Sequence, residues 1–208
     1  MEKRAYDIYS KATRDVSIRV IPGHCATRHS HVNYCVDMTK VKSELDASKA
    51  TAKLFCDALG ATPVDTIITL DRMKMVGAFV AHYLSHTYIN KGQDIAVISP
   101  EISNDKLLLR DNFLSYVKGK RVMLLTASAT TGKDANSVVE GISYYGGIPV
   151  AVVSVFGGNF ACPVPVYKLF GLEDIPDYSS NSPVDCPLCR QGVKVDAVVN
   201  SYGYSKSI

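Results

Sequence analysis

The chain has 208 residues, of which 47% are hydrophobic and 21% charged, values typical of one globular domain with a sizeable core. Its net charge of +3 suits small anionic ligands but falls short of a nucleic-acid surface, which needs clustered Lys and Arg. No apolar run approaches a membrane span, and the first ten residues lack an apolar signal core. We therefore expect a cytoplasmic protein with reduced cysteines and no membrane or nucleic-acid partner.

The first part of the chain mixes expected strands and helices. The expected elements are a short helix over residues 1–13, a strand over 16–21 ended by Pro22-Gly23, a strand over 32–36 with Val32, Tyr34 and Val36 on one face, and a helix over about 40–59. The last of these helices would turn inward Val41, Leu45, Ala52, Phe55 and Leu59, with Gly60 as its stop.

From residue 64 onward, strands and helices alternate. Strands are expected over residues 64–70, 94–99, 122–125 and 149–156, with helices after the first and third of them. This alternation predicts a parallel sheet with helices on both faces, so we expect ligands at the carboxyl ends of its strands. The last fifty residues are expected to form a tail that packs on this domain.

A polar loop connects strand 122–125 to the following helix. Gly132 lets the backbone approach a ligand, while Thr130, Thr131 and Lys133 supply two hydroxyls and a cation beside the helix amides. Asp134 is expected to cap this helix, and Gly146-Gly147 to end it. The loop therefore predicts an anion site, most naturally for a phosphate monoester. A P-loop fits poorly, because Ala127 replaces its first glycine and Asp134 its magnesium-binding hydroxyl.

The loop and its strand resemble the signature of the type I phosphoribosyltransferases. That signature is a hydrophobic strand, two acidic residues, two variable residues and Thr-Thr-Gly, and here Thr126-Ala127 replace the acidic pair. The resemblance implies an α/β fold, a type I phosphoribosyltransferase-like parallel sheet flanked by helices with a small N-terminal hood. It implies one domain over residues 1–208, with the hood at about 14–38, the core at about 40–158 and the tail at about 160–208. An ordinary strand–turn–helix crossover is the alternative.

The resemblance also assigns site residues. It gives substrate-binding roles to the whole stretch Thr126, Ala127, Ser128, Ala129, Thr130, Thr131, Gly132, Lys133 and Asp134. Lys74 resembles the lysine that orotate phosphoribosyltransferases often carry at the pyrophosphate loop, and Arg72 would add a second charge; two solvated cations at a helix start are the alternative. In the stretch matching the family's mobile loop, Lys106 and Arg110 are the cations that would reach a neighbouring subunit, which implies a homodimer. Leu107–Leu109 there suggests a hairpin arm that packs on the protein.

Residues 30–37, Ser-His-Val-Asn-Tyr-Cys-Val-Asp, resemble the hood that covers the base in orotate phosphoribosyltransferases. The resemblance makes Tyr34 the ring that stacks on the base, with Asn33 and His31 as further base contacts. Two departures argue against orotate: the hood's usual lysine falls at Cys25, and an arginine of the helix after the phosphate loop falls at Asn136. A buried carboxylate without a cation is costly.

Cys186 and Cys189 have the spacing of half a zinc site. If the tail folds back, the other ligands could come from His24, Cys25, His29, His31 and Cys35. We favour reduced structural cysteines, and so assign no metal ligand, with zinc as the alternative. Cys-Pro-Leu-Cys tails followed by glycine, here Gly192, also occur in some orotate phosphoribosyltransferases.

The resemblance implies an enzyme that exchanges the pyrophosphate of phosphoribosyl pyrophosphate (PRPP) for a nucleobase nitrogen, with Mg²⁺ accompanying PRPP and orotate as the favoured base. Lys74, Lys106 and Arg110 would be catalytic. One alternative is a regulatory protein that binds PRPP or a nucleotide without turnover, which the missing acidic pair favours; another is an unrelated nucleotide-binding α/β domain. We expect weak or selective activity, raised by changing Thr126 and Ala127 together to Asp. We also expect Gly132→Val to abolish phosphate binding and leave the fold intact.

Overall fold

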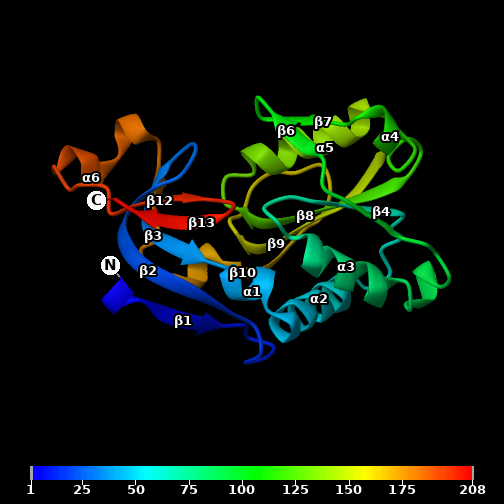
Figure 1. Ribbon diagram of the computed structural model, residues 1–208, viewed down its shortest axis with the longest axis horizontal. Coiled ribbons are helices and arrows are strands. Elements are labelled where there is room, and N and C mark those ends of the chain that lie inside the picture. The colour runs from blue at the N-terminus through cyan, green and yellow to red at the C-terminus, as the bar shows by residue number, and fades with distance from the viewer. Residues whose placement is uncertain (1, 208) are drawn as a thin grey trace.

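The structure is a computed structural model that describes residues 2–207, and a five-stranded parallel sheet forms its larger part (Figure 1). The strand order is β10-β9-β8-β4-β5, and every neighbouring pair is parallel. The strands are β4 (Thr66–Thr69), β5 (Ala96–Ile98), β8 (Arg121–Ala129), β9 (Ile148–Gly157) and β10 (Val166–Gly171). The predicted α/β fold with a parallel sheet is confirmed. Among residues 2–207, no helix is both long and apolar enough to cross a membrane.

Helices cover both faces of this sheet. One face carries α2 (Leu45–Leu59) and α3 (Lys74–Leu84); the other carries α5 (Lys133–Tyr144) and the hairpin of β6 (Glu101–Ser103) and β7 (Lys106–Leu108), followed by α4 (Asp111–Leu114) (Figure 1). Consecutive strand residues enter opposite cores: Ile67 packs with the α2–α3 side and Ile68 with the α5 side. Burial on both faces explains why these strands are apolar throughout.

A second, six-stranded sheet, here called the hood sheet, combines the N-terminal region with the tail (Figure 1). Its strands are β1 (Tyr6–Tyr9), β2 (Ser17–Ala26), β3 (His31–Asp37), β11 (Ser180–Asn181), β12 (Ala197–Asn200) and β13 (Gly203–Lys206). A separate small core of Ile21, Cys25, Val32, Cys35 and Ala197 lies within it. The tail thus does more than pack on the domain, because it supplies β10 to the parallel sheet and three strands to the hood sheet.

Two N-terminal predictions are wrong. Of the helix expected over residues 1–13, the described residues 2–13 form none: after a single 3-10 turn, η1 (Glu2–Arg4), strand β1 pairs antiparallel with β2. An available strand partner outweighs the local helix pattern here. Strand β2 also does not stop at Pro22-Gly23 but passes through them with a bulge. Pro22 is tolerated because β3 is its neighbour on one side, while β1 and β12 pair with β2 only before and after it.

The helix predicted over residues 40–59 is two helices. The short α1 (Thr39–Ser43) and α2 are separated at Glu44, whose backbone is extended (φ −97°, ψ 133°). Leu45 was expected to point inward and is 54% exposed, since the break resets the helical phase. The rest of the inward stripe is buried, and Gly60 ends α2 with a positive φ of 52°.

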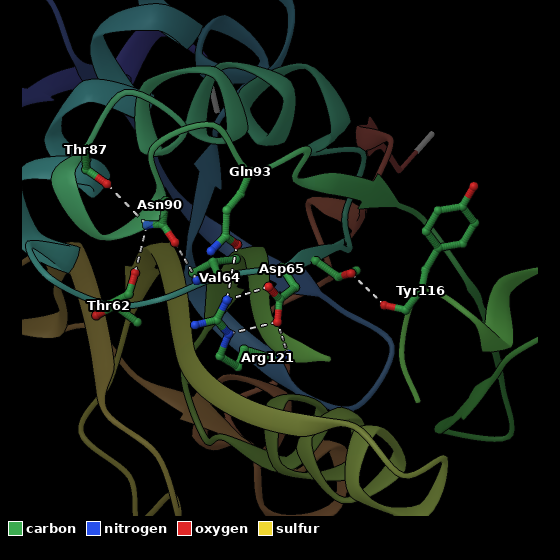
Figure 2. A network of polar contacts seen from close by, with 9 residues as sticks. Thr62, Val64, Asp65, Thr87, Asn90, Gln93, Tyr116 and Arg121 are labelled. Atoms are coloured by element: carbon green, nitrogen blue, oxygen red, sulfur yellow. Dashed lines mark hydrogen bonds and ion pairs between the residues drawn. The ribbon is translucent and has the colours of Figure 1, made fainter. Parts of the chain in front are cut away.

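The amino end of the parallel sheet is closed by a hydrogen-bonded network (Figure 2). Arg121 donates from its backbone amide and Nε to Asp65 Oδ2, both at 2.8 Å, and from Nη2 to Asp65 Oδ1 at 2.6 Å. The same Nη2 reaches Gln93 Oε1 at 3.1 Å. The buried Asn90 accepts the Val64 amide at 2.9 Å. These hydrogen bonds from Arg121 lower the pKa of Asp65 to about 2, so this end of the sheet carries a satisfied ion pair.

Candidate active site

At the carboxyl ends of β4 and β8, a carboxylate lies where the family signature has lost its acidic pair. Asp71 follows β4, and its Oδ2 accepts hydrogen bonds from Thr126 Oγ1 at 2.6 Å and from the Ala127 amide at 3.2 Å. Thr126 and Ala127 are buried, because β8 continues to Ala129 and does not end at Leu125 as predicted. The neighbouring strand therefore brings a negative charge to positions 126–127.

The backbone that presents this carboxylate is strained. Asp71 and Arg72 both have positive φ angles, 50° and 64°, in the left-handed region that non-glycine residues rarely adopt. Each such residue costs on the order of 1–2 kcal/mol. The conformation turns Asp71 toward β8, while the Arg72 guanidinium lies 4.6 Å from the centroid of the Tyr202 ring. Strain retained at a strand end is typical of functional sites.

A second cation near Asp71 was missed by the sequence reasoning. Lys42 lies on α1, half-buried, and its Nζ donates to the Ser201 carbonyl at 3.3 Å. Burial lowers the pKa of the Lys42 ammonium, and the negative charges of Asp71 and Asp37 partly oppose that shift. No sequence signal marked Lys42, because its placement depends on the helix break at Glu44. Lys74, the expected pyrophosphate lysine, is exposed at the first position of α3.

The phosphate loop, residues 130–134, connects β8 to α5 as predicted. The predicted cap is wrong: Gly132, with φ 76°, is the N-cap, and Asp134 lies exposed in the first turn. Helix α5 ends at Tyr144, and Gly146 follows with φ 77°, which agrees with the predicted stop. Thr131 and Lys133 are exposed beside the first helix turn, so hydroxyl, ammonium and amides are available to an anion there.

Phe160 lies directly over Gly132. A Cβ built on Gly132 would come within 2.2 Å of Phe160 Cδ2. The ring also borders a cavity of about 290 Å³ lined by Gly158, Asn159, Phe160, Cys162, Val164, Val166 and Lys168. The expectation that Gly132→Val leaves the fold intact is therefore contradicted, because any side chain here meets Phe160 and a left-handed backbone.

The β6–β7 hairpin lies over the α5 side of the sheet, and the predicted hairpin arm is confirmed. Leu107 packs against Gly141 of α5, which leaves no room for a Cβ there. At the hairpin turn, Asp105 pairs with Arg28 of the hood sheet's β2–β3 turn at 3.0 Å and with Lys133 at 3.6 Å. The hairpin thus touches both the hood and the phosphate loop within one chain.

The two cations expected to act across a dimer lie on this arm. Lys106 and Arg110 are both exposed, and Arg110 pairs with Glu101 at 2.7 Å. Among residues 2–207, no hydrogen bond or ion pair connects Lys106 or Arg110 to Asp71 of the same chain. Their role toward a neighbouring subunit stays a prediction.

The three expected base contacts all have partners in the tail. The Tyr34 ring stacks on Tyr178, with centroids 6.5 Å apart and an interplanar angle of 17°. Asn33 donates from Nδ2 to the Asp177 carbonyl at 2.6 Å and accepts the Ser179 amide at 2.7 Å. His31 instead lies beside His24 and Cys189. Their contact with a base stays a prediction, and Asn33 and His31 have structural partners that compete with it.

No family model matches the chain, but individual relatives do. The orotate phosphoribosyltransferase of Thermotoga maritima is 32% identical over 125 residues, which are 58% of this chain and 62% of that protein. The chain therefore spans somewhat less than two thirds of the length of that relative. The orotate phosphoribosyltransferase of Chlorobium phaeobacteroides is 24% identical over 182 residues, 86% of this chain and 88% of that protein.

Solved structures agree on the fold. Orotate phosphoribosyltransferase from Mycobacterium tuberculosis, in complex with Fe(III) dicitrate, superposes with a TM-score of 0.53 at 19% identity, over 76% of this chain and 91% of that chain. A structure of the same protein in complex with PRPP gives a TM-score of 0.50 at 18% identity, over 67% and 82%. The chain has the fold of the type I phosphoribosyltransferases. Its relatives in sequence are the orotate phosphoribosyltransferases.

The two positions that argue against orotate contain no cation. Cys25 is fully buried in the small hood core. Asn136 donates from Nδ2 to the Ala161 carbonyl at 2.9 Å, and its Oδ1 is buried without a hydrogen-bond donor among residues 2–207. Any cation for an acidic base must therefore come from elsewhere, and Lys42 and Arg72 are the two basic residues grouped with Asp71.

The tail brings a second group of residues together. His24, His31, Cys186 and Cys189, here called the Cys/His cluster, place one ligand atom each within 4.8 Å of one another. Of the other candidates, Cys25 and Cys35 lie in the small hood core, and His29 faces Asp105 at 3.4 Å. The geometry thus favours the metal alternative over unligated cysteines.

Proposed function

We propose that this chain is a phosphoribosyltransferase acting on PRPP and a nucleobase, with orotate as the favoured base. One observation carries the proposal: the Asp71 carboxylate lies bonded to Thr126 and Ala127, beside the Thr-Thr-Gly loop. The similarity to orotate phosphoribosyltransferases and the PRPP complex of the M. tuberculosis protein support the same assignment.

In this proposal, each group at the sheet edge has one task. The α5 amides with Thr130, Thr131 and Lys133 bind the 5′-phosphate. Asp71 uses Oδ2 for the protein and retains acceptor capacity on Oδ1 for a ribose hydroxyl. Its charge then lies near the carbon that becomes positive as pyrophosphate leaves, which is electrostatic stabilisation of the transition state.

The leaving pyrophosphate needs positive charge, and Arg72 and Lys74 follow Asp71 directly in the chain. Mg²⁺ is bound in phosphate sites by one or two carboxylates together with substrate oxygens, and Asp71 is a carboxylate that fits such a role. When bound, the ion would neutralise charge on the pyrophosphate. Asp71, Arg72 and Lys74 would hold this end of PRPP in place.

The choice of base depends on which charged side chains lie near Asp71. Lys42 is a half-buried cation on the helix that follows the hood, and with Arg72 it could pair with the carboxylate of orotate. The Lys42 ammonium already donates to the Ser201 carbonyl, and a carboxylate on the base would add a charge-assisted hydrogen bond that a neutral base does not offer. Lys42 therefore favours an acidic base and offsets the argument from Cys25 and Asn136.

A regulatory protein that binds PRPP without turnover is the second candidate. Thr126 and the Ala127 amide both donate to Asp71, so part of the carboxylate's capacity is already used. A single partly used carboxylate in place of two would bind a ribose and still stabilise the transition state poorly.

The test is PRPP binding by calorimetry, followed by pyrophosphate release with orotate, uracil, adenine and hypoxanthine. We expect binding, release with orotate, and a loss of at least tenfold in kcat/KM for Lys42→Met with orotate. The matched control is Lys91→Met, which changes an exposed lysine in a turn distant in sequence from Lys42. Binding without release for any base supports the regulatory candidate, and absence of PRPP binding refutes both.

We further propose that the phosphoribosyltransferase is a homodimer in which Lys106 or Arg110 acts in the partner's site. Mixing Asp71→Asn with the double variant Lys106→Ala/Arg110→Ala tests this directly. Shared sites would recover up to about a quarter of wild-type activity, because one site in four of the mixture is then intact. No recovery, from variants shown to exchange subunits, would contradict it.

A further inference from the structure

The Cys/His cluster joins two parts of the chain that are far apart in sequence. His24 comes from β2 and His31 from β3, while Cys186 is the N-cap of the single turn α6 (Pro187–Arg190) in the tail and Cys189 lies within that turn. His24 and Cys186 are each only 2% exposed. The four residues thus converge from a sheet and a tight turn onto one mostly buried point.

Four of the six distances between the ligand atoms of the cluster match the edges of a small tetrahedron, and the other two are at most 4.8 Å. His24 Nε2 lies 3.0 Å from His31 Nδ1, 3.5 Å from Cys186 Sγ and 3.6 Å from Cys189 Sγ, and His31 Nδ1 lies 3.2 Å from Cys189 Sγ. Zinc–nitrogen bonds of about 2.0–2.1 Å and zinc–sulfur bonds of about 2.3 Å give tetrahedral edges of about 3.3 Å between nitrogens and about 3.5 Å between nitrogen and sulfur. All four measured edges fall within about 0.4 Å of these values.

Hydrogen bonding alone does not account for this arrangement. His24 Nδ1 lies 2.9 Å from the Val193 carbonyl, which can only accept, so Nδ1 carries the proton of a neutral ring. Nε2 then has one lone pair, yet His31 Nδ1 and both sulfur atoms approach it. A single lone pair accepts one good hydrogen bond, whereas one cation satisfies all four ligand atoms at once.

Hydrogen bonds from the tail hold the His24 ring and backbone in place. Its ring donates to Val193, its backbone amide donates to Asp196 Oδ2 at 2.9 Å, and its carbonyl accepts the Asp196 amide at 2.7 Å. A backbone carbonyl that fixes the histidine tautomer is a recurrent feature around metal-binding imidazoles. The tail segment that carries the cysteines therefore also orients the first histidine.

We propose that the Cys/His cluster binds one structural zinc ion that fastens the C-terminal tail to the hood sheet. Two imidazoles and two thiolates are a typical set for structural zinc, and four protein ligands leave no open position for catalysis. The fastened segment continues into β12 and β13, whose turn carries Ser201 against Lys42 and Tyr202 against Arg72. The ion thus holds the hairpin that lies over the two cations beside Asp71. This inference does not depend on the proposed function.

The first experiment measures metal content. The chain is purified with reductant and without an affinity tag that binds metal, dialysed against metal-free buffer, and analysed by mass spectrometry of the elements. We expect about one zinc per chain, and replacement by Co²⁺ should give the visible spectrum of tetrahedral cobalt with thiolate-to-cobalt charge transfer. Less than about a tenth of an ion per chain, even after zinc is added back, overturns the proposal.

Variants identify the ligands. Cys189→Ser is the most useful change, because Cys189 is exposed and its loss leaves the packing intact; Cys162→Ser is the matched control from outside the cluster. We expect zinc affinity to fall at least 100-fold in Cys189→Ser and His31→Ala, with loss of the cobalt charge-transfer band in proportion to the thiolates removed. Equal zinc content in all variants, or a Cys186–Cys189 disulfide found by thiol counting in the freshly purified protein, contradicts the assignment.

Discussion

The two ends of the parallel sheet differ in how their charged residues are paired. At the amino end, Asp65 and Arg121 pair through three hydrogen bonds, with Gln93 as a further partner (Figure 2). At the carboxyl end, Asp71 is held on a strained backbone, Arg72 lies against the Tyr202 ring, and Lys74 is exposed.

This contrast separates stability from function within one sheet. A satisfied ion pair on relaxed backbone lowers the free energy of the folded state, whereas strain and spare charge raise it and are retained for a ligand. Changes at the amino end should therefore cost stability and leave chemistry unaffected. Changes at the carboxyl end should lower activity and leave stability unaffected. The exception is a change that places a new charge in the buried end of β8, which should lower stability.

The largest expected effect comes from restoring the family's acidic pair. The sequence alone suggested that Thr126→Asp/Ala127→Asp would raise activity; the structure reverses that expectation, because both positions are buried against Asp71. Additional buried carboxylates beside an existing one should cost on the order of 3–5 kcal/mol in the free energy of unfolding. Urea denaturation measures it, with Ser128→Asp as the exposed control on the same strand. A double variant as stable as wild type would show that the end of β8 is open to solvent.

The next effect concerns Gly132. Gly132→Ala adds one Cβ against Phe160 on a left-handed backbone, so we expect about 2–3 kcal/mol of destabilisation and a loss of phosphate affinity. Phe160→Ala in the same chain should recover the part due to the collision and leave the part due to the backbone, about 1 kcal/mol. Thermal unfolding with and without inorganic phosphate separates the two. If Phe160→Ala recovers nothing, the ring is not what restricts this position.

At the amino end, Asp65→Asn should lower the free energy of unfolding by about 1–2 kcal/mol at neutral pH and leave kcat/KM within twofold of wild type. The pKa of Asp65 is lowered from 3.8 to about 2 by Arg121, so its contribution is complete above pH 4–5 and is lost as the pH falls toward 2. The difference between wild type and variant should therefore shrink across that window. A difference that is constant down to pH 2 would mean that the pair does not stabilise the fold.

The smallest expected effect is that of Tyr202. Its ring lies under the Arg72 guanidinium at the end of the β12–β13 hairpin, and such a contact contributes about 0.5–1 kcal/mol. Tyr202→Ala should raise KM for PRPP two- to fivefold with kcat unchanged, while Tyr88→Ala, an exposed tyrosine elsewhere, should change neither. A fall in kcat would give Tyr202 a role in the chemistry itself.

The sequence predicted local features well and contacts between distant segments poorly. The alternating strands, the α5 stripe and the Thr-Thr-Gly loop follow from periodicity and spacing, because they depend on neighbouring residues. Asp71 reaching across to β8 depends on tertiary structure, and no local pattern encodes it. The spacing of Cys186 and Cys189 indicated half a metal site, but the choice of His24 and His31 among five candidate ligands also depends on tertiary structure. The N-terminal strand β1 was missed for the same reason, since it depends on its partner β2. The break at Glu44 was also missed, and no residue pattern marked it.

The most direct test of the central claim is the turnover of PRPP with orotate by wild type, Asp71→Asn and Asp65→Asn, compared side by side as pyrophosphate release. Asparagine keeps the size of aspartate and tolerates a positive φ, so Asp71→Asn removes the charge with little other change. The account predicts a loss of at least about 100-fold in kcat/KM for Asp71→Asn and less than twofold for Asp65→Asn. Equal activity of wild type and Asp71→Asn would show that this carboxylate does not replace the missing acidic pair.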